Sequence, residues 1–231
     1  MKNSLAVIVP FFNEEKTIEL SLRRLLKVNV VQQIICVNDC STDKSLKIVE
    51  QLKNEDSRIE IISNKVNSGK GHAITSAKKY VNTTHVAIHD ADLEYFPDDL
   101  VSMWGVVEKH TDSLILGSRF VGSEIRKNIY KRTYIANKFM SLFFSLINFY
   151  KITDVATCYK LFPNKFFQSI NIHEKGFSIE IELLSKFLKF NRSIFEVPIK
   201  YEGRSYSEGK KIKSKDGILY LINTIKYRFL T

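Results

Sequence analysis

The sequence lacks an apolar run long enough to cross a bilayer. A membrane-spanning helix needs about 20 consecutive, mostly apolar residues, whereas the longest apolar stretch, FMSLFFSLINFY, covers only residues 139–150 and has a lysine on either side. Two interpretations of this stretch stay open: a helix inside the core, or a helix whose aromatic face lies on a bilayer surface. The amino-terminal apolar stretch is shorter and has no small-residue cleavage site, so we expect a first strand there, not a signal peptide.

Cysteine is also scarce. Cys36, Cys40 and Cys158 make an odd number, and no pair has zinc-ribbon spacing, so we expect free thiols in a reducing cytosol. Repeats, low-complexity segments and Pro/Gly-rich linkers are missing as well. We therefore expect one continuous domain over residues 1–231.

Acidic residues are outnumbered by basic ones. The chain has 35 Lys and Arg against 25 Asp and Glu, a net charge of +10. Such a surplus suits nucleic acid, an anionic membrane or phosphorylated small molecules. Because the chain has no aromatic–basic repeats and no recognisable reader motif, a basic nucleic-acid-binding protein is the most remote of these alternatives.

The first half alternates between two hydrophobic periodicities. Short β-branched runs predict strands, and residues 17–27 and 45–53 have apolar residues at helical spacing. This alternation predicts an α/β fold with a mostly parallel sheet and helices on both faces. The expected strands are residues 5–10, 33–38, 59–62, 85–89 and 113–117.

The second half is expected to be mostly helical. We predict helices at about 128–150, at 176–190 and at 217–230, with one strand at 193–202 and a basic loop before the last helix.

Polar loops follow four of the predicted strands. They read PFFNEE, NDCSTD, NSGKG and HDADLE. Because the carboxyl ends of parallel strands meet at one edge of a sheet, these loops should converge where open α/β folds bind ligands.

The HDADLE loop places carboxylates at alternate positions. Asp90 and Asp92 are hard oxygen ligands at a strand end, which suits Mg²⁺ or Mn²⁺ held partly by substrate phosphates. For Asp98 we favour capping of the next helix. Asp39, at another strand end, can accept hydrogen bonds from a base or ribose, or cap a helix, and Glu14 has the same ambiguity.

The NSGKG loop is not a Walker loop. Position 64 is Asn where the first Gly would be needed, and position 71 is Gly where Ser or Thr would be needed. Lys70 is still a candidate to lie near a phosphate.

Nine motifs together resemble one family. In chain order they are PFFNEE, VNDCSTD, NSGKGHA, DADLEYFP, GSRF, TDVATCYKLF, GFSIEIELL, VPIKY and GRSYSEGKKI. They look like the family-2 inverting glycosyltransferases of the GT-A fold, most of all the dolichyl-phosphate mannose synthase branch, over about residues 4–230. The resemblance implies a Rossmann-like, mostly parallel sheet with a nucleotide-sugar-binding half (1–120) and an acceptor-side half (121–231) that ends in a helical, basic extension.

The resemblance also implies a role for each matching position. Asp92 and Glu94 would bind the metal, and Asp90, Asp92, Arg119 and Arg204 would form the catalytic set. The nucleotide sugar would contact Pro10, Glu14, Asp39, Lys70 and Asp90. The acceptor phosphate would contact Arg119, Arg132 and Arg204.

Three positions depart from the family pattern. Glu94 stands where Gln is usual, Asn38 where Asp is usual, and Cys40 where Gly is usual. The carboxylate of Glu94 should still ligate a metal.

The implied reaction moves a hexose from a nucleotide sugar, of the GDP-mannose or UDP-glucose type, to a dolichyl or undecaprenyl phosphate. The enzyme would be cytoplasmic and peripheral on the cytosolic membrane face, and a membrane-protein partner is a further expectation. A lipid phosphate is already an anion, so no general base is required. The alternative is transfer to a sugar hydroxyl in cell-surface polysaccharide assembly, which needs a base; Glu180 and Glu182 are the candidates.

The carboxyl-terminal segment favours the lipid acceptor. Residues 199–231 hold eight basic and three acidic residues beside an aromatic helix with Tyr220, Tyr227 and Phe229. This combination suits docking on an anionic bilayer, at about 1 kcal/mol per basic residue. A solvated basic loop over a core-packed helix is the alternative. The basic residues are Lys200, Arg204, Lys210, Lys211, Lys213, Lys215, Lys226 and Arg228.

Overall fold

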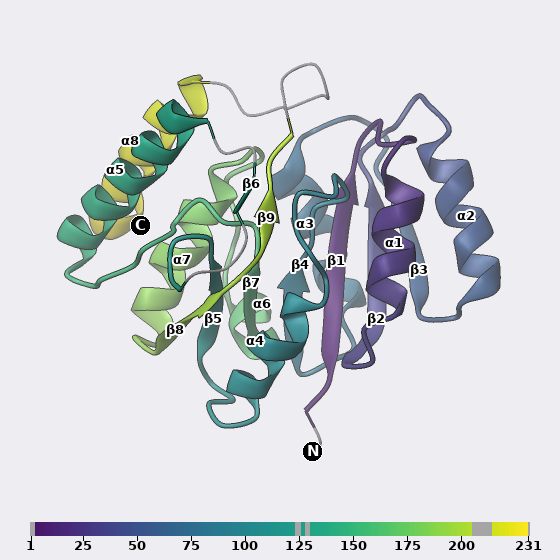
Figure 1. Ribbon diagram of the computed structural model, residues 1–231, viewed down its shortest axis with the longest axis horizontal. Helices are drawn as coiled ribbons and strands as arrows, with labels where there is room; N and C mark the ends of the chain where they lie inside the picture. Colours follow the sequence, from purple (N-terminus) through teal and green to yellow (C-terminus); the bar gives the residue numbers. More distant parts are fainter. Residues whose placement is uncertain (1–2, 123–125, 128–129, 205–213, 231) are drawn as a thin grey trace.

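A seven-stranded sheet forms the centre of the computed structural model (Figure 1), which describes residues 3–122, 126–127, 130–204 and 214–230. The strand order is β3-β2-β1-β4-β7-β5-β8. The strands are β1 (Leu5–Phe11), β2 (Val31–Asn38), β3 (Ile59–Ser63), β4 (His85–Ile88), β5 (Leu114–Ser118), β7 (Lys160–Pro163) and β8 (Ile194–Pro198).

The sheet is mostly parallel, as predicted. β1 pairs in parallel with β2 and β4, β2 with β3, and β5 with β8. Only β7 is antiparallel to its neighbours β4 and β5. Residues Leu5–Val9 of β1 are fully buried, which is expected for a parallel strand covered on both faces.

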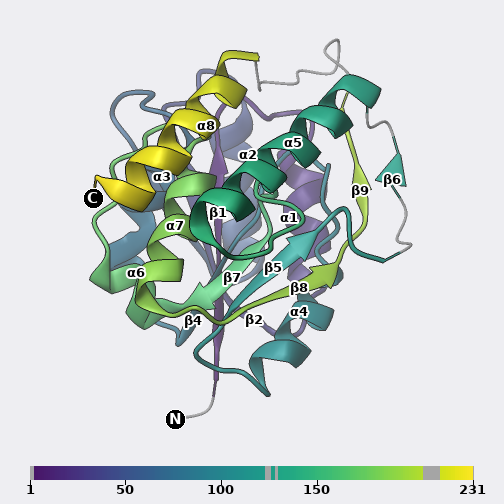
Figure 2. The same cartoon turned by 90° about the vertical axis from the view of Figure 1, so that its left-hand side faces the viewer.

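Helices lie on both faces of the sheet (Figures 1 and 2). The short strands β6 (Arg126–Lys127) and β9 (Tyr201–Glu202) form a second, parallel pair. The helices are α1 (Ile18–Leu26), α2 (Ser45–Glu55), α3 (Lys70–Ala77), the 3₁₀ turn η1 (Lys78–Tyr80), α4 (Asp99–Val107), α5 (Lys131–Asn148), α6 (Asn164–Ser169), α7 (Ile179–Phe190) and α8 (Ser214–Phe229).

Two predictions of secondary structure were wrong. The single strand expected at 193–202 is divided, because β8 ends at Pro198 and β9 pairs with β6 instead. A proline nitrogen carries no hydrogen and cannot continue a ladder. β7 was not predicted, because its four residues, KLFP, begin with a lysine and end with a proline.

Helices α5 and α8 lie side by side, on the side of the molecule opposite α2 (Figures 1 and 2). Their polarity is inverted relative to a helix on a water-facing surface. From Ile135 onward, every exposed residue of α5 is apolar, and the same holds for the described side chains of α8. The large exposed residues are Ile135, Phe139, Leu142 and Leu146 on α5 with Phe149 just after it, and Ile218, Leu219, Ile222, Ile225 and Phe229 on α8 with Leu230 just after it. We call this set the α5–α8 face.

The buried sides of the same two helices are polar. Asn137, Ser141 and Asn148 of α5 and Asn223 and Thr224 of α8 are at most 8% exposed. Three of these side chains donate to a carbonyl four residues earlier: Ser141 to Asn137 at 2.8 Å, Asn148 to Phe144 at 3.0 Å, and Thr224 to Tyr220 at 2.8 Å. Internal hydrogen bonds thus satisfy these buried groups.

The core interpretation of residues 139–150 is therefore wrong for the outer side of α5. Phe144 is fully buried, but Phe139, Leu142, Leu146 and Phe149 are 55–80% exposed. No helix among the described residues is long and apolar enough to cross a membrane.

Candidate active site

The loops at the carboxyl ends of β1, β2 and β4 converge, together with the start of α3, on a cavity of about 190 Å³. Residues of α5, α7, α8 and β9 complete the wall from the acceptor side. Of the ten residues to which the family resemblance assigns a role, Arg132 alone does not line the cavity; it is exposed in the first turn of α5, one residue before the cavity-lining Thr133. The nine that line it are Pro10, Glu14, Asp39, Lys70, Asp90, Asp92, Glu94, Arg119 and Arg204.

The cavity is acidic although the chain is basic. Among the described residues, six carboxylates line it, against the three cations Lys70, Arg119 and Arg204. A local surplus of carboxylates in a chain of net charge +10 favours a bound cation at this place. The carboxylates belong to Glu14, Asp39, Asp90, Asp92, Glu94 and Glu180.

Among the described residues, Arg204 is the cation that pairs with Asp92. Its Nη2 lies 2.9 Å from Asp92 Oδ2, and its Nη1 lies 3.2 Å from Glu14 Oε2. Burial, followed by the charges of Glu94 and Asp90, raises the pKa of Asp92 to about 7, although Arg204 opposes the rise. Asp92 is thus a carboxylate with more negative charge around it than one guanidinium balances.

Glu94 anchors the segment that carries Arg204. The Tyr201 hydroxyl donates to Glu94 Oε2 at 2.6 Å, and the Arg204 backbone N–H donates to Oε1 at 2.8 Å. The backbone N–H of Glu202 donates to the Glu94 carbonyl at 2.9 Å. Both carboxylate oxygens of Glu94, which was predicted to bind the metal, therefore already accept one hydrogen bond each. These bonds hold the Tyr201–Arg204 segment in place, a role that the sequence did not reveal.

The donor set fits a divalent cation that a substrate helps to hold. Among the described residues, no three His, Cys, Asp or Glu side chains gather as a complete metal site. Mg²⁺ is usually bound by one or two protein carboxylates together with phosphate oxygens and water. Asp92, with Asp90 and Glu94 beside it, supplies that partial set.

Lys70 lies between two carboxylates and not in an open phosphate loop. Its Nζ is 2.8 Å from Asp90 Oδ1 and 2.9 Å from Glu180 Oε1. Burial alone would raise the pKa of Asp90, but Lys70 holds it below its ordinary value. Glu180 also pairs with Lys160, which is fully buried in β7. A row of alternating charges, Asp90–Lys70–Glu180–Lys160, therefore joins β4 and α3 to α7 and β7.

Glu182, the other candidate base, cannot act as a base in the cavity because its carboxylate is buried and bound elsewhere. It is fully buried, accepts the backbone N–H groups of His173 at 2.9 Å and Glu174 at 2.8 Å, and pairs with Lys186 at 2.6 Å. It is not among the residues that line the cavity.

Asp39 holds the NSGKG loop in place. Its carboxylate accepts the backbone N–H of Gly69 at 2.7 Å and of Ser68 at 3.1 Å, and the side-chain amide of Asn64 at 2.9 Å. The loops after β2 and β3 are thereby joined at the cavity wall. Asp98 occupies the predicted N-cap position of α4, but its exposed side chain makes no capping hydrogen bond.

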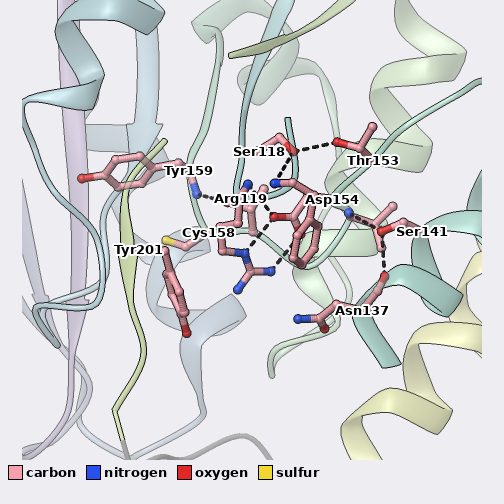
Figure 3. A network of polar contacts seen from close by, with 12 residues as sticks. Ser118, Arg119, Asn137, Ser141, Thr153, Asp154, Cys158, Tyr159 and Tyr201 are labelled. Carbon is pink, nitrogen blue, oxygen red and sulfur yellow. Dashed lines mark hydrogen bonds and ion pairs between the residues drawn. The ribbon is translucent and has the colours of Figure 1, made fainter. Parts of the chain in front are cut away.

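Arg119 is bound by a partner that the sequence did not reveal. Asp154 accepts from its Nε at 2.7 Å, its Nη2 at 2.8 Å and its backbone N–H at 3.0 Å (Figure 3). The guanidinium also lies over the Tyr201 ring, 4.9 Å from its centroid. One edge of Arg119 is therefore occupied, and Nη1 is left without a hydrogen-bond partner among the described residues.

Three loops of the cavity contain a non-glycine residue in the left-handed region. The φ angles are 52° at Asn13, 66° at Cys40 and 67° at Leu93, in the loops after β1, β2 and β4. Asn tolerates this conformation, whereas Leu does so at a cost. The angle at Cys40 explains why glycine suits that position.

We expect Cys40→Gly to raise the free energy of unfolding by about 0.5–1 kcal/mol, because relief of the left-handed strain exceeds the added entropy of the unfolded chain. Urea denaturation measures the change. Cys40→Ala is the matched control, since it removes the thiol but keeps the strained backbone. Equal stabilisation by alanine would show that the thiol, and not the backbone, is responsible.

The comparisons with known proteins identify the family and the fold. A model described as glycosyl transferase family 2 matches residues 6–170, more than half of the chain. Dolichyl-phosphate β-glucosyltransferase from Trichomonas vaginalis is 28% identical over 240 residues, which cover 96% of this chain and 72% of that protein. Polyprenol monophosphomannose synthase from Mycolicibacterium smegmatis is 23% identical over 211 residues, or 88% and 79% of the two chains. Two other relatives, an uncharacterized glycosyltransferase from Synechocystis and the uncharacterized glycosyltransferase YaiP from Escherichia coli, match this chain over only 35% and 29% of their own lengths.

Solved structures share the fold. Glucosyl-3-phosphoglycerate synthase from Mycobacterium tuberculosis, crystallised with Mn²⁺, uridine diphosphate and glucosyl-3-phosphoglycerate, superposes with a TM-score of 0.73 at 16% identity, over 98% of this chain and 80% of that one. The expected GT-A fold is thereby confirmed. With its sheet, its loops and its family match in agreement, the chain belongs to glycosyl transferase family 2.

Proposed function

We propose that this glycosyltransferase moves a hexose from a nucleotide sugar, of the GDP-mannose or UDP-glucose type, to a polyprenyl phosphate. One observation carries the choice of acceptor: α5 and α8 line the cavity with Thr133, Asn137 and Tyr220 and turn an apolar face outward. An acceptor with a phosphate head and a hydrocarbon tail fits both sides of these helices. The printed names of the two relatives, which specify dolichyl phosphate and polyprenol monophosphate, support the same acceptor class.

In this proposal the whole chain, 1–231, works as one catalytic domain. Residues 1–120 hold the nucleotide sugar through Pro10, Glu14, Asp39 and Asp90, with Lys70 fixing Asp90. Residues 121–231 supply the acceptor side. The sugar is attacked from the face opposite the diphosphate, so its anomeric configuration inverts.

Asp92 is the proposed principal ligand of Mg²⁺ or Mn²⁺, with Glu94 as a second oxygen donor. The metal would act as a Lewis acid on the leaving diphosphate, whose negative charge grows as the sugar departs. The Mn²⁺ in the synthase structure supports this assignment. Arg204 forms ion pairs with Asp92 and Glu14, so its guanidinium lies in the cavity, where the phosphate groups would bind.

Arginines are the proposed contacts of the acceptor phosphate, because guanidinium groups bind phosphate oxygens in pairs. Arg204 lines the cavity, as does Arg119, whose Nη1 has no hydrogen-bond partner within the described part of the chain. Arg132 would meet the phosphate from outside, since it is exposed at the start of α5. A phosphate monoester is already an anion, so no general base is needed.

The α5–α8 face is the proposed contact with an anionic bilayer on its cytosolic side. Lys131 and Arg132 are exposed at one end of α5 and Lys151 just beyond the other, and basic residues near such a surface add about 1 kcal/mol each. Lys210, Lys211 and Lys213 of the predicted basic loop lie outside the described residues. A membrane-protein partner beside this face is a further part of the proposal.

An acceptor assay tests the function. Radiolabelled UDP-glucose or GDP-mannose is mixed with the protein, Mn²⁺ and phosphatidylglycerol vesicles that contain undecaprenyl or dolichyl phosphate. We expect label in the organic phase, and none after EDTA is added. Parallel reactions contain 3-phosphoglycerate or an oligosaccharide instead of the lipid; transfer to either of these but not to the lipid would overturn the proposed acceptor.

A further inference from the structure

The buried carboxylate of Glu180 is the most unusual polar group of the cavity. Glu180 is 2% exposed and lines the cavity from the first turn of α7. Its Oε2 pairs with Lys160, and its Oε1 lies 2.9 Å from Lys70 Nζ. Nevertheless, Oε1 receives no hydrogen bond of acceptable geometry from the described residues.

A buried acceptor without a hydrogen bond is costly unless a ligand provides one. Glu180 offers this acceptor oxygen beside two lysines, Lys70 and Lys160. A carboxylate repels the diphosphate and the acceptor phosphate, but it accepts hydroxyl groups well. Sugar hydroxyls are the donors that a nucleotide sugar would bring into this cavity.

The position of Glu180 also suits a sugar. Lys70 bridges Glu180 and Asp90, so Glu180 lies next to the strand end proposed to face the donor, yet on a helix of the acceptor side. The transferred hexose must lie between the leaving diphosphate and the acceptor. Phe177 and Tyr220 line the cavity as well and offer apolar surface for the C–H face of a sugar ring.

We propose that Glu180 binds the transferred hexose by accepting a hydrogen bond from one of its hydroxyl groups at Oε1, and that Lys70, which bridges Glu180 and Asp90, positions this carboxylate. The inference rests on the proposed use of a nucleotide sugar. It assigns Glu180 to substrate binding and not to the abstraction of a proton from an acceptor.

Calorimetric binding without any acceptor tests the assignment. With Mn²⁺ present, the dissociation constants of UDP and UDP-glucose, and of GDP and GDP-mannose, are measured for wild type and Glu180→Gln. The quantity compared is the ratio of the nucleoside diphosphate constant to the nucleotide-sugar constant. A hydrogen bond to a charged group implies a fall of roughly tenfold in this ratio, through weaker binding of the nucleotide sugar and unchanged binding of the diphosphate.

Two further variants separate binding from folding. Glu180→Gln leaves the buried Lys160 without a charged partner, so the double variant Lys160→Met/Glu180→Gln removes both charges together, and circular dichroism verifies that it folds. It should show the same tenfold fall. Lys160→Met alone disturbs the same charge row but keeps Oε1, and its ratio should stay within about twofold of wild type.

The outcomes distinguish this inference from the proposed function. A wild-type ratio in the folded Glu180→Gln or double variant would overturn the hexose contact, as would an equal loss in Lys160→Met. A wild-type ratio combined with slow turnover would assign Glu180 to proton abstraction instead. If wild type binds neither nucleotide sugar, the proposed function falls, and the hexose contact with it.

Discussion

Asp92→Asn is expected to lower kcat/KM for the nucleotide sugar by about 10³-fold. Loss of a metal-binding carboxylate removes several kcal/mol of stabilisation from a transition state in which charge develops on the leaving diphosphate. The replacement is isosteric, and Asp92 is held by Arg204 at 2.9 Å on the cavity wall. Initial rates with either labelled donor, measured over a range of Mn²⁺ concentrations, give both the loss and the shift in metal affinity.

Asp98→Asn is the matched control for Asp92. It removes a carboxylate from the same loop, but Asp98 is exposed, does not line the cavity and makes no capping hydrogen bond. We expect its kcat/KM to stay within about twofold of wild type. Metal-dependent turnover at the wild-type rate in Asp92→Asn would remove Asp92 from the metal site.

Replacing Phe139, Leu142 and Leu146 together with serine should abolish binding to anionic vesicles. These side chains are 55–63% exposed on α5, and burial of a large apolar side chain contributes about 1.5–3 kcal/mol when complete. Partial burial of three side chains in a bilayer then implies a decrease of about 10²–10³-fold in partitioning. Co-sedimentation with phosphatidylglycerol vesicles measures it.

Leu20, Val66 and Val101 provide the control triple variant. They are 46%, 67% and 51% exposed, but lie outside the α5–α8 face. Their replacement with serine should leave vesicle binding unchanged, and both triple variants should bind nucleotide sugar like wild type. Equal loss of vesicle binding in the two variants, or vesicle binding that persists without the three α5 residues, would contradict the docking surface.

Most of the fold could be predicted from the sequence because the periodicities are strong. The runs at 5–10 and 33–38 fall within β1 and β2, and 17–27 contains α1. β7 could not be predicted, because four residues that include the buried Lys160 do not form a strand pattern. Its place between β4 and β5 depends on long-range pairing that no local signal encodes.

The cavity residues could be found because parallel strands deliver their loops to one edge. What could not be found is which charge pairs with which. Nothing near Arg119 points to Asp154, 35 residues away, and nothing near Lys70 points to Glu180. The sequence predicted a helix at about 128–150, but not which side of that helix faces the interior.

The strained positions in the cavity loops are held by bonds between loops. The Asn13 backbone N–H donates to Ser41 at 3.1 Å, Asp39 accepts from Gly69 in the next loop, and Lys70 reaches Asp90 in the fourth. A loop that opened alone would release its own strain but leave its neighbours' polar groups without partners. The four loops should therefore open together as a single cooperative unit, separately from local unfolding of the sheet beneath them.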